Sequence, residues 1–206
     1  MTLIELYRRS LNEFVDRAEH LRPEDWARPT PCAEWDVRAL VNHIVGEDRW
    51  TVPLIAGETI AEVGDRFAGD LLGDDPIGTA VDAAKQAESA VVEPGAIERN
   101  VDLSSGRTPA REYLHELLAD HLIHAWDLAS AVGGSQRLNP EVVHAVAEWF
   151  APREELYRKA GVIGPRVEVP EGADEQDRLL AAFGRDPAWT APDGGPGHGG
   201  RHRAAT

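Results

Sequence analysis

The chain has one cysteine, one methionine, and aromatic residues at only 6% of its 206 positions. A single cysteine cannot form an intramolecular disulfide, so a reducing compartment is the natural location. No run of about eighteen apolar residues occurs, and we therefore expect no transmembrane helix. The N-terminal residues become acidic at once and contain no apolar stretch of signal-peptide length. These absences together predict a cytoplasmic protein that does not bind membranes.

Basic residues are also scarce, with 21 Lys and Arg against 36 Asp and Glu. The formal net charge is -15 and the pI is about 4.9. A protein that binds duplex nucleic acid needs clustered Lys and Arg to displace counterions from the phosphates. An acidic chain without a basic run therefore has no expected nucleic-acid partner, and it does not suit an anionic membrane surface. Hydrophobic residues make up 42%, enough for the core of one domain.

Apolar residues recur at steps of three and four over most of the chain, which is the pattern of amphipathic helices. Thr2 and Glu5 form a possible capping box before the first helix. Asp36 is a suitable N-cap for the second helix, which we expect to end near Pro53. The expected helices cover about 3–21, 37–53, 76–92, 109–132 and 140–160. Sequential helices of this kind predict an all-α, up-and-down bundle.

The remaining segments are shorter or irregular. Residues 58–75 are expected to form a loop or short helix, 97–109 a short extended excursion, 167–169 a short strand, and 177–183 one or two helical turns. From Gly184 onward the chain is rich in Gly, Pro and Arg. We therefore expect one domain over 1–187 and a disordered tail over 188–206.

Two of the expected helices carry residues that could bind a metal. Asp120 and His124 are four residues apart and share one helix face, and His43 shares a face with Glu47 in the same way. Taken one helix at a time, each pattern has a plainer interpretation: His43 as a histidine of the core, and Asp120 with His124 as a solvated ion pair. If the helices pack side by side, two imidazoles and one carboxylate converge, as in an open catalytic metal site. The apolar residues around Asp120 favour the metal, because a buried unpaired carboxylate is costly.

Other residues near this group have competing interpretations. His121 is the rival third ligand, about 60° around the helix from His124 against about 40° for Asp120. Asp127 continues the stripe and suits the orientation of a ligand imidazole or the binding of an arginine, although a salt bridge between helices explains it equally well. Cys32 precedes a helix N-terminus, where a thiol pKa falls, but it also suits a small packed residue.

Several runs of residues resemble the actinobacterial metal-binding branch of the DinB-like superfamily. This branch is related to the N-terminal domain of mycothiol-dependent maleylpyruvate isomerase. The resemblance extends to about Pro187 and is carried by these runs: Thr30-Pro31-Cys32, Trp35-Asp36-Val37-Arg38, Leu40-Val41 with His43, His124-Ala125-Trp126-Asp127-Leu128-Ala129, Val167-Glu168-Val169-Pro170 and 177–187.

The resemblance implies a four-helix up-and-down bundle with an additional helix and a short C-terminal extension. It also implies a divalent metal, expected to be zinc, held by three residues. Carried over to this sequence, the ligands are His43, Asp120 and His124. His121, Glu47 and Asp127 are then supporting residues or alternative ligands. Relatives often have Glu or His at the position matched to Asp120.

The resemblance further implies a metal-dependent transferase or isomerase that uses a low-molecular-weight thiol such as mycothiol. A thiol of pKa about 8.5 is mostly protonated at neutral pH, and a metal can stabilise its thiolate for attack on a small electrophile. The isomerase has a larger C-terminal domain, so maleylpyruvate itself is a doubtful substrate. The alternatives are a non-catalytic metal-binding module and a metal-dependent hydrolase of a small substrate. The oligomeric state stays open, with a homodimer as one option.

No residue can be assigned a catalytic role or a cofactor contact from the sequence alone. Four arginines are candidates to hold an anionic thiol cofactor, although solvation at the surface is the plainer role for each: Arg38, Arg49, Arg107 and Arg111.

Overall fold

The structure, a computed structural model, describes residues 1–192, and these residues are predominantly helical. Thr2 caps the first helix through the expected capping box with Glu5, and Asp36 caps the second. The elements are α1 (Leu3–Ala18), the 3-10 helix η1 (Pro23–Asp25), α2 (Val37–Ala56), α3 (Ile60–Val63), α4 (Pro76–Val91), β1 (Asn100–Leu103), β2 (Gly106–Pro109), α5 (Ala110–Val132), α6 (Pro140–Phe150), α7 (Glu154–Lys159) and α8 (Glu175–Ala182).

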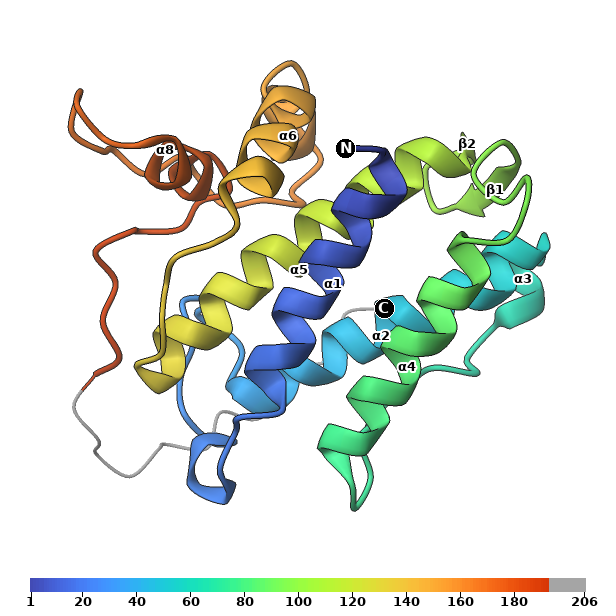
Figure 1. The fold of residues 1–206 in the computed structure, drawn as a ribbon, viewed down its shortest axis with the longest axis horizontal. Coiled ribbons are helices and arrows are strands. Elements are labelled where there is room, and N and C mark those ends of the chain that lie inside the picture. The colour runs from blue at the N-terminus through green and yellow to red at the C-terminus, as the bar shows by residue number, and fades with distance from the viewer. Residues whose placement is uncertain (193–206) are drawn as a thin grey trace.

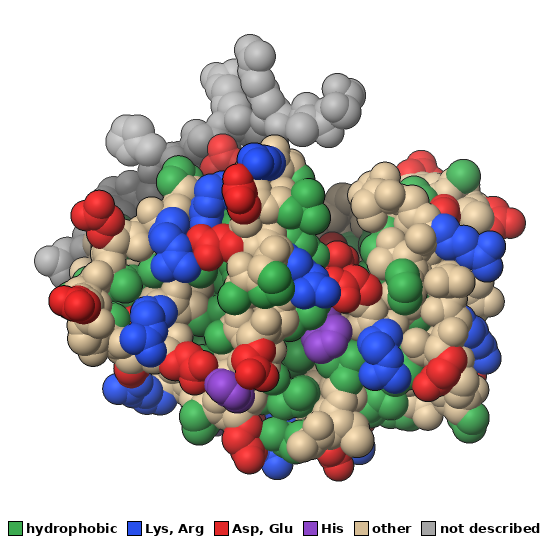
Figure 2. All heavy atoms as spheres, turned by 90° about the horizontal axis from the view of Figure 1, so that it is seen from above, with side chains coloured by type: hydrophobic (Ala, Val, Ile, Leu, Met, Phe, Trp, Pro, Cys, Tyr) green, Lys and Arg blue, Asp and Glu red, His purple; other side chains and the backbone are tan. Residues whose placement is uncertain are grey.

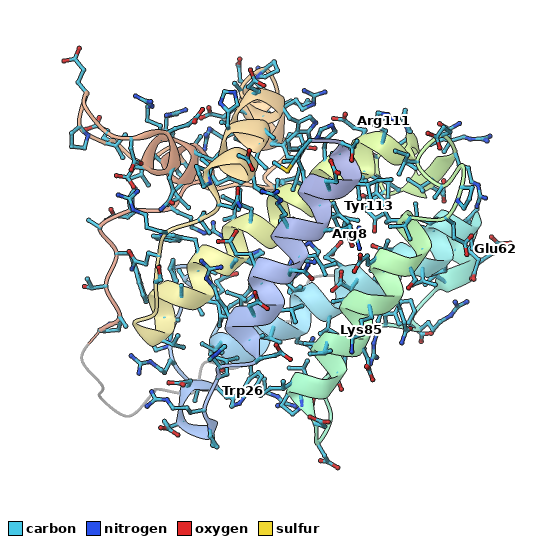
Figure 3. All side chains as sticks on the ribbon, in the orientation of Figure 1. Arg8, Trp26, Glu62, Lys85, Arg111 and Tyr113 are labelled. Carbon is cyan, nitrogen blue, oxygen red and sulfur yellow. The ribbon has the colours of Figure 1, made fainter. Side chains whose placement is uncertain are left out.

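Four long helices, α1, α2, α4 and α5, form the bundle shown in Figure 1. Both α4 and α5 pack against α1 and against α2, and the long connections 19–36 and 57–75 make this arrangement possible. At the surface, Arg8 of α1 pairs with Glu88 of α4; Figure 3 labels the arginine. The expectation of an all-α fold of the DinB-like type is confirmed.

Helix α5 is the central helix of the molecule. Almost every residue from Leu117 to Ala131 is buried, including the polar side chains of His121, His124 and Asp127. Helix α1 covers one side of α5, and α6 lies on another side with α8 packed against it (Figure 1). A helix that is apolar around its whole circumference is expected to be buried. The buried polar groups of this stretch, His121, His124 and Asp127, are therefore held in a largely dry environment.

The short extended excursion expected near 97–109 is a β-hairpin. β1 and β2 pair antiparallel, with Val101 opposite Thr108. Gly106 follows the turn with φ of 105°, a conformation that glycine adopts without steric cost. Asp102 accepts a hydrogen bond from the backbone N–H of Ile60, at 3.2 Å, which ties the hairpin to α3. The hairpin thus stands at one end of α2 and α5.

Two helix boundaries near prolines differ from those that the sequence predicts. Helix α2 continues past Pro53 to Ala56. Only one turn follows the proline, and that turn is stabilised because its residues Leu54 and Ile55 are buried. The expected helix over 140–160 is instead divided into α6 and α7. Pro152 lies at this break, and its ring and missing N–H disfavour a continuous helix.

The C-terminal segments also differ in detail. Residues 167–169 form no strand, although Val167 donates one backbone hydrogen bond to Ala181, at 3.1 Å. The last helix begins at Glu175, earlier than expected, because Asp174 provides an N-cap. Trp189 packs against the core, within the first part of the expected tail. Residues 193–206, the rest of that expected tail, lie outside the described residues. Among the described helices, none has the length and apolar character that a membrane span requires.

Candidate metal centre

The packing of α2 against α5 brings together His43, Asp120 and His124. The Nε2 atom of His43 lies 3.0 Å from Oδ2 of Asp120, and the Nε2 atom of His124 lies 3.3 Å from Oδ1 of the same carboxylate. Ligand atoms of all three residues lie within 4.8 Å of one another. The structure therefore collects in one place the three residues that the sequence suggested as metal ligands.

Asp120 and His124 perturb each other electrostatically. Burial alone would raise the pKa of Asp120, but the neighbouring imidazoles of His43 and His124 lower it well below its ordinary value. Burial alone would lower the pKa of His124, but Asp120 and Asp127 raise it well above the ordinary value. The three side chains therefore form a coupled network in which the ionised form of Asp120 and the protonated form of His124 stabilise each other.

The ring of His124 is fixed from its other side. Its Nδ1 atom lies 2.9 Å from Oδ2 of Asp127, whose carboxylate is fully buried. Arg185, in the segment after α8, donates to both oxygens of Asp127, from Nε at 2.9 and 3.1 Å. A carboxylate on the outer nitrogen of a histidine fixes the ring orientation and makes its other nitrogen a better metal ligand.

Trp35 covers the two imidazoles. Its ring centroid lies 4.7 Å from that of His43 and 5.5 Å from that of His124, with tilted rings. The backbone carbonyl of Trp35 accepts hydrogen bonds from the N–H and the hydroxyl of Thr30, which hold the loop before α2 in place. This loop therefore limits the freedom of both histidine rings.

A second group of potential donors overlaps the first. Cys32, His124 and Asp127 also offer ligand atoms within 4.8 Å of one another. However, Nη2 of Arg185 lies 2.7 Å from the sulfur of Cys32 and 3.0 Å from Oδ2 of Asp127. A guanidinium charge fixed at these atoms opposes a metal cation. The group of His43, Asp120 and His124 is therefore the better candidate.

His121 points away from this group. Its Nε2 atom lies 3.1 Å from Oδ1 of the buried Asp48, and its Nδ1 atom lies 2.7 Å from the carbonyl oxygen of Leu117. Tyr7 and Phe14 of α1 pack edge-on against its ring. The structure places this histidine in an ion pair of the bundle core and leaves Asp120 as the third member of the candidate site.

A cavity of about 860 Å³ opens beside the candidate ligands. Figure 2 views the molecule from the side of α6 and the hairpin, where a hollow separates two parts of the surface and charged side chains stand at its edge. Glu47, one of the expected neighbours, is half-buried in the cavity wall. Burial and the negative charge of Asp120 raise the pKa of Glu47. The volume is typical of a site for a small organic molecule.

The family of the chain follows from comparison with known proteins. Residues 7–129 match the profile of the mycothiol maleylpyruvate isomerase N-terminal domain. The chain belongs to this family. Two uncharacterized proteins from two strains of Mycobacterium tuberculosis are each 29% identical over 195 residues, which cover 87% of this chain and 95% of theirs. The crystal structure of the mycothiol-dependent maleylpyruvate isomerase has a TM-score of 0.55 at 16% identity, over 71% of this chain and 68% of that one. This structural match shows a shared fold.

In this family member, several residues of the site escaped prediction from the sequence. Arg185 binds Asp127, which in turn fixes the ring of His124, and Trp35 packs over both histidines. The cavity wall adds polar groups from α5, α6 and α7. None of the four arginines suggested as cofactor ligands lines the cavity within the described residues; its arginines are Arg153 and Arg185. The helical spacing of Glu112, Glu116 and Asp120 is the one signal that the sequence offered, because these carboxylates lie four residues apart on one face of α5.

Proposed function

We propose that this chain is a divalent-metal-dependent transferase or isomerase that uses a low-molecular-weight thiol such as mycothiol and a small electrophile. Zinc is the expected metal. The observation that carries the proposal is the convergence of two imidazole nitrogens and one carboxylate on the wall of a cavity large enough for two small reactants. Membership of the mycothiol maleylpyruvate isomerase family supports the use of a thiol. A cytoplasmic location suits such chemistry, because thiols stay reduced there.

The residues present fit such an ion. His43, Asp120 and His124 provide the three nitrogen and oxygen ligands that are typical of a catalytic zinc site, which keeps one position open. The Nδ1 atom of His124 is already bound by Asp127, so its Nε2 atom is the one directed towards the group. When bound, the ion supplies a positive charge that favours the thiolate form of a thiol in the open position.

The protein itself contributes orientation and the exclusion of water. Asp127 and Arg185 fix the ring of His124, and Trp35 packs over both imidazoles. Apolar side chains of α5, including Leu117 and Ile123, form part of the cavity wall. A site with these walls strengthens the electrostatic interactions inside it and holds two reactants at close range.

Metal analysis tests the proposal most directly. We expect about one divalent ion per chain in the purified or reconstituted protein. His43→Ala and His124→Ala are expected to lose it. His144→Ala is the matched control, because this histidine lies on the exposed face of α6 and pairs with Glu175. Titration with mycothiol, or with another low-molecular-weight thiol, is then expected to perturb the spectrum of a cobalt-substituted site.

The outcomes separate the alternatives. Metal that is retained in both histidine variants would contradict the site. Metal that is bound but insensitive to every thiol tested would contradict the thiol-dependent reaction while leaving the site intact. Hydrolytic turnover without thiol would then favour the metal-dependent hydrolase, and no turnover would favour the non-catalytic metal-binding module.

A further inference from the structure

Among the carboxylate and guanidinium groups that line the cavity, the acidic ones predominate; the two histidines of the lining are the candidate metal ligands. Six ionisable carboxylate and guanidinium side chains face it in the described part of the chain: Glu47, Glu112, Glu116, Asp120, Arg153 and Arg185. Both arginines are already bound. Nε of Arg153 donates to Oε1 of Glu112 at 2.7 Å, and Arg185 is bound by Asp127. A carboxylate that enters the cavity would therefore have to compete with carboxylates already in place.

Two of the acidic groups, Glu47 and Glu116, form no salt bridge among the described residues. Glu116 accepts a hydrogen bond from the hydroxyl of Tyr157, at 2.6 Å, and burial raises the pKa of its carboxyl. Glu47 is half-buried in the cavity wall. A further negative charge beside Glu47 or Glu116 would lose its hydration and gain no ion pair from the side chains of the protein.

The rest of the lining is largely apolar. Leu156 of α7 and Val162 just beyond it are 66% and 67% exposed, yet both line the cavity. A ligand that covers exposed apolar side chains of this size gains binding free energy, because it removes their surface from water. Further apolar lining comes from α2, α3, the hairpin, α5, α6 and the segment after α8: Trp50, Leu54, Ile60, Leu103, Ile123, Trp149 and Phe183. An apolar group fits this surface, and a charged one does not.

We infer that the electrophile used by this site carries an uncharged apolar group, alkyl or aryl, and no carboxylate. This inference rests on the proposed function and specifies its second substrate. It is carried by the four carboxylates and two ion-paired arginines of the lining together with the exposed Leu156 and Val162. The substrate class is therefore a small electrophile with an apolar substituent. A dicarboxylate such as maleylpyruvate falls outside this class.

Binding of two matched thioethers to the zinc-loaded protein tests the inference without any turnover. The probes are S-benzyl-N-acetylcysteinamide and its 4-carboxybenzyl analogue, which differ only by one carboxylate at the far end of the ring. Isothermal titration calorimetry is expected to give at least tenfold tighter binding for the benzyl compound. Equal affinity, tighter binding of the carboxylate, or no binding of the benzyl compound would each overturn the inference.

Matched variants identify the cause of the preference. Glu116→Gln keeps the acceptor for Tyr157 but removes a charge, so the ratio of the two affinities is expected to fall at least threefold. Glu155→Gln is the control, because this residue is exposed on α7, pairs with Lys159 and does not line the cavity. Leu156→Ser is expected to weaken both probes. A ratio unchanged by Glu116→Gln would contradict the electrostatic argument.

The two proposals can fail separately. If the zinc-loaded protein does not respond to any thiol while the tenfold preference for the benzyl probe persists, the proposed function is wrong and the description of the cavity stands. If thiol transfer occurs but the carboxylate probe binds as well as the neutral one, the proposed function stands and the substrate class is wrong.

Discussion

Arg185 binds Asp127 across 58 positions of the chain, with its Nε atom 2.9 Å from one carboxylate oxygen and 3.1 Å from the other. The same carboxylate lies 2.9 Å from Nδ1 of His124. The segment that follows α8 is thereby connected to a candidate metal ligand on α5. Since Asp127 is fully buried, its charge depends on this arginine and on the histidine for compensation.

Removal of Arg185 is expected to affect both stability and metal binding. Arg185→Ala leaves the buried Asp127 with His124 as its remaining charged partner, and the loss of the guanidinium costs about 3 kcal/mol in the free energy of unfolding. The ring of His124 also loses part of its support, so zinc affinity is expected to fall about 10–100-fold. Urea unfolding and a competition titration with a zinc chelator measure the two effects.

The control for this prediction is Arg137→Ala. Arg137 forms an exposed ion pair with Asp174 at 2.6 Å, and such pairs contribute at most about 1 kcal/mol. Zinc affinity is expected to stay at the wild-type value in this variant. An Arg185→Ala protein with normal zinc affinity would show that the orientation of His124 does not depend on this contact.

The pair of His121 and Asp48 gives a second prediction, which separates core stability from metal binding. Both side chains are almost completely buried, and Asp48 raises the pKa of His121 against the opposing effect of burial. His121→Ala leaves Asp48 unpaired and is expected to lower the free energy of unfolding by about 3 kcal/mol or more. The variant is nevertheless expected to bind about one metal ion per chain.

If His121→Ala proves too unstable to purify, His121→Gln provides the same test with a side chain that can still donate to Asp48. Metal content is measured beside unfolding in urea. Loss of metal from a folded His121 variant would return this histidine to the ligand set in place of Asp120.

The contrast between these histidines shows how far sequence reasoning reaches. The pairing of Asp120 with His124 follows from a spacing of four along one helix, which is a local property. The choice between Asp120 and His121 depends on how α5 is rotated about its axis, and packing against Tyr7 and Phe14 decides it. The periodicity of the helices likewise depends on nearby residues. The sequence therefore predicts the long helices α1, α2, α4 and α5 to within a few residues at each end.

Contacts between distant segments could not be predicted in the same way. Arg185 belongs to a stretch that resembles a tail in composition, and its place beside Asp127 depends on the path of the chain after α6. Pro53 and Pro152 carry the same local signal, yet one lies inside α2 and the other at a break between helices. Tertiary burial of the residues around each proline makes the difference.

The pH dependence of the metal-free protein gives a third prediction. The pKa of His124 is raised in the folded state, against burial, by Asp120 and Asp127. Its stabilising contribution is therefore complete below the unfolded value of about 6.5 and is lost as the pH rises through the folded pKa. The pKa of Asp120 is lowered, so its contribution is present above about 4 and is lost as the pH falls through the folded pKa.

Thermal unfolding between pH 3 and pH 9 checks this prediction. The metal-free protein is expected to be most stable at mildly acidic pH and to lose stability on the alkaline side, whereas zinc-loaded protein is stabilised there because the proton no longer competes for His124. Zinc affinity is expected to rise over the same alkaline range. A zinc affinity independent of pH would mean that metal binding displaces no proton from this network.

Substitution of Asp120 gives the fourth prediction, and it tests the carboxylate member of the candidate ligand set. Asp120→Asn keeps the size of the side chain but removes the charge, so zinc affinity is expected to fall by more than the 10–100-fold that loss of a supporting residue costs. Asp120→Glu keeps the carboxylate on a longer side chain. Because the carboxylate of Asp120 is 31% exposed towards solvent, the longer side chain has room to adjust, and zinc binding is expected to be retained within about tenfold.

The two variants together distinguish a ligand from a residue that only supports the histidines. A supporting carboxylate would tolerate Asn, since the amide oxygen can accept from one of the two histidines and the amide N–H can donate to the unprotonated nitrogen of the other. Both variants would then bind zinc similarly. A ligand requires the negative charge, so the Asn variant alone would lose the metal. The measurement is metal content after dialysis against a weak chelator, with circular dichroism to establish that both variants are folded.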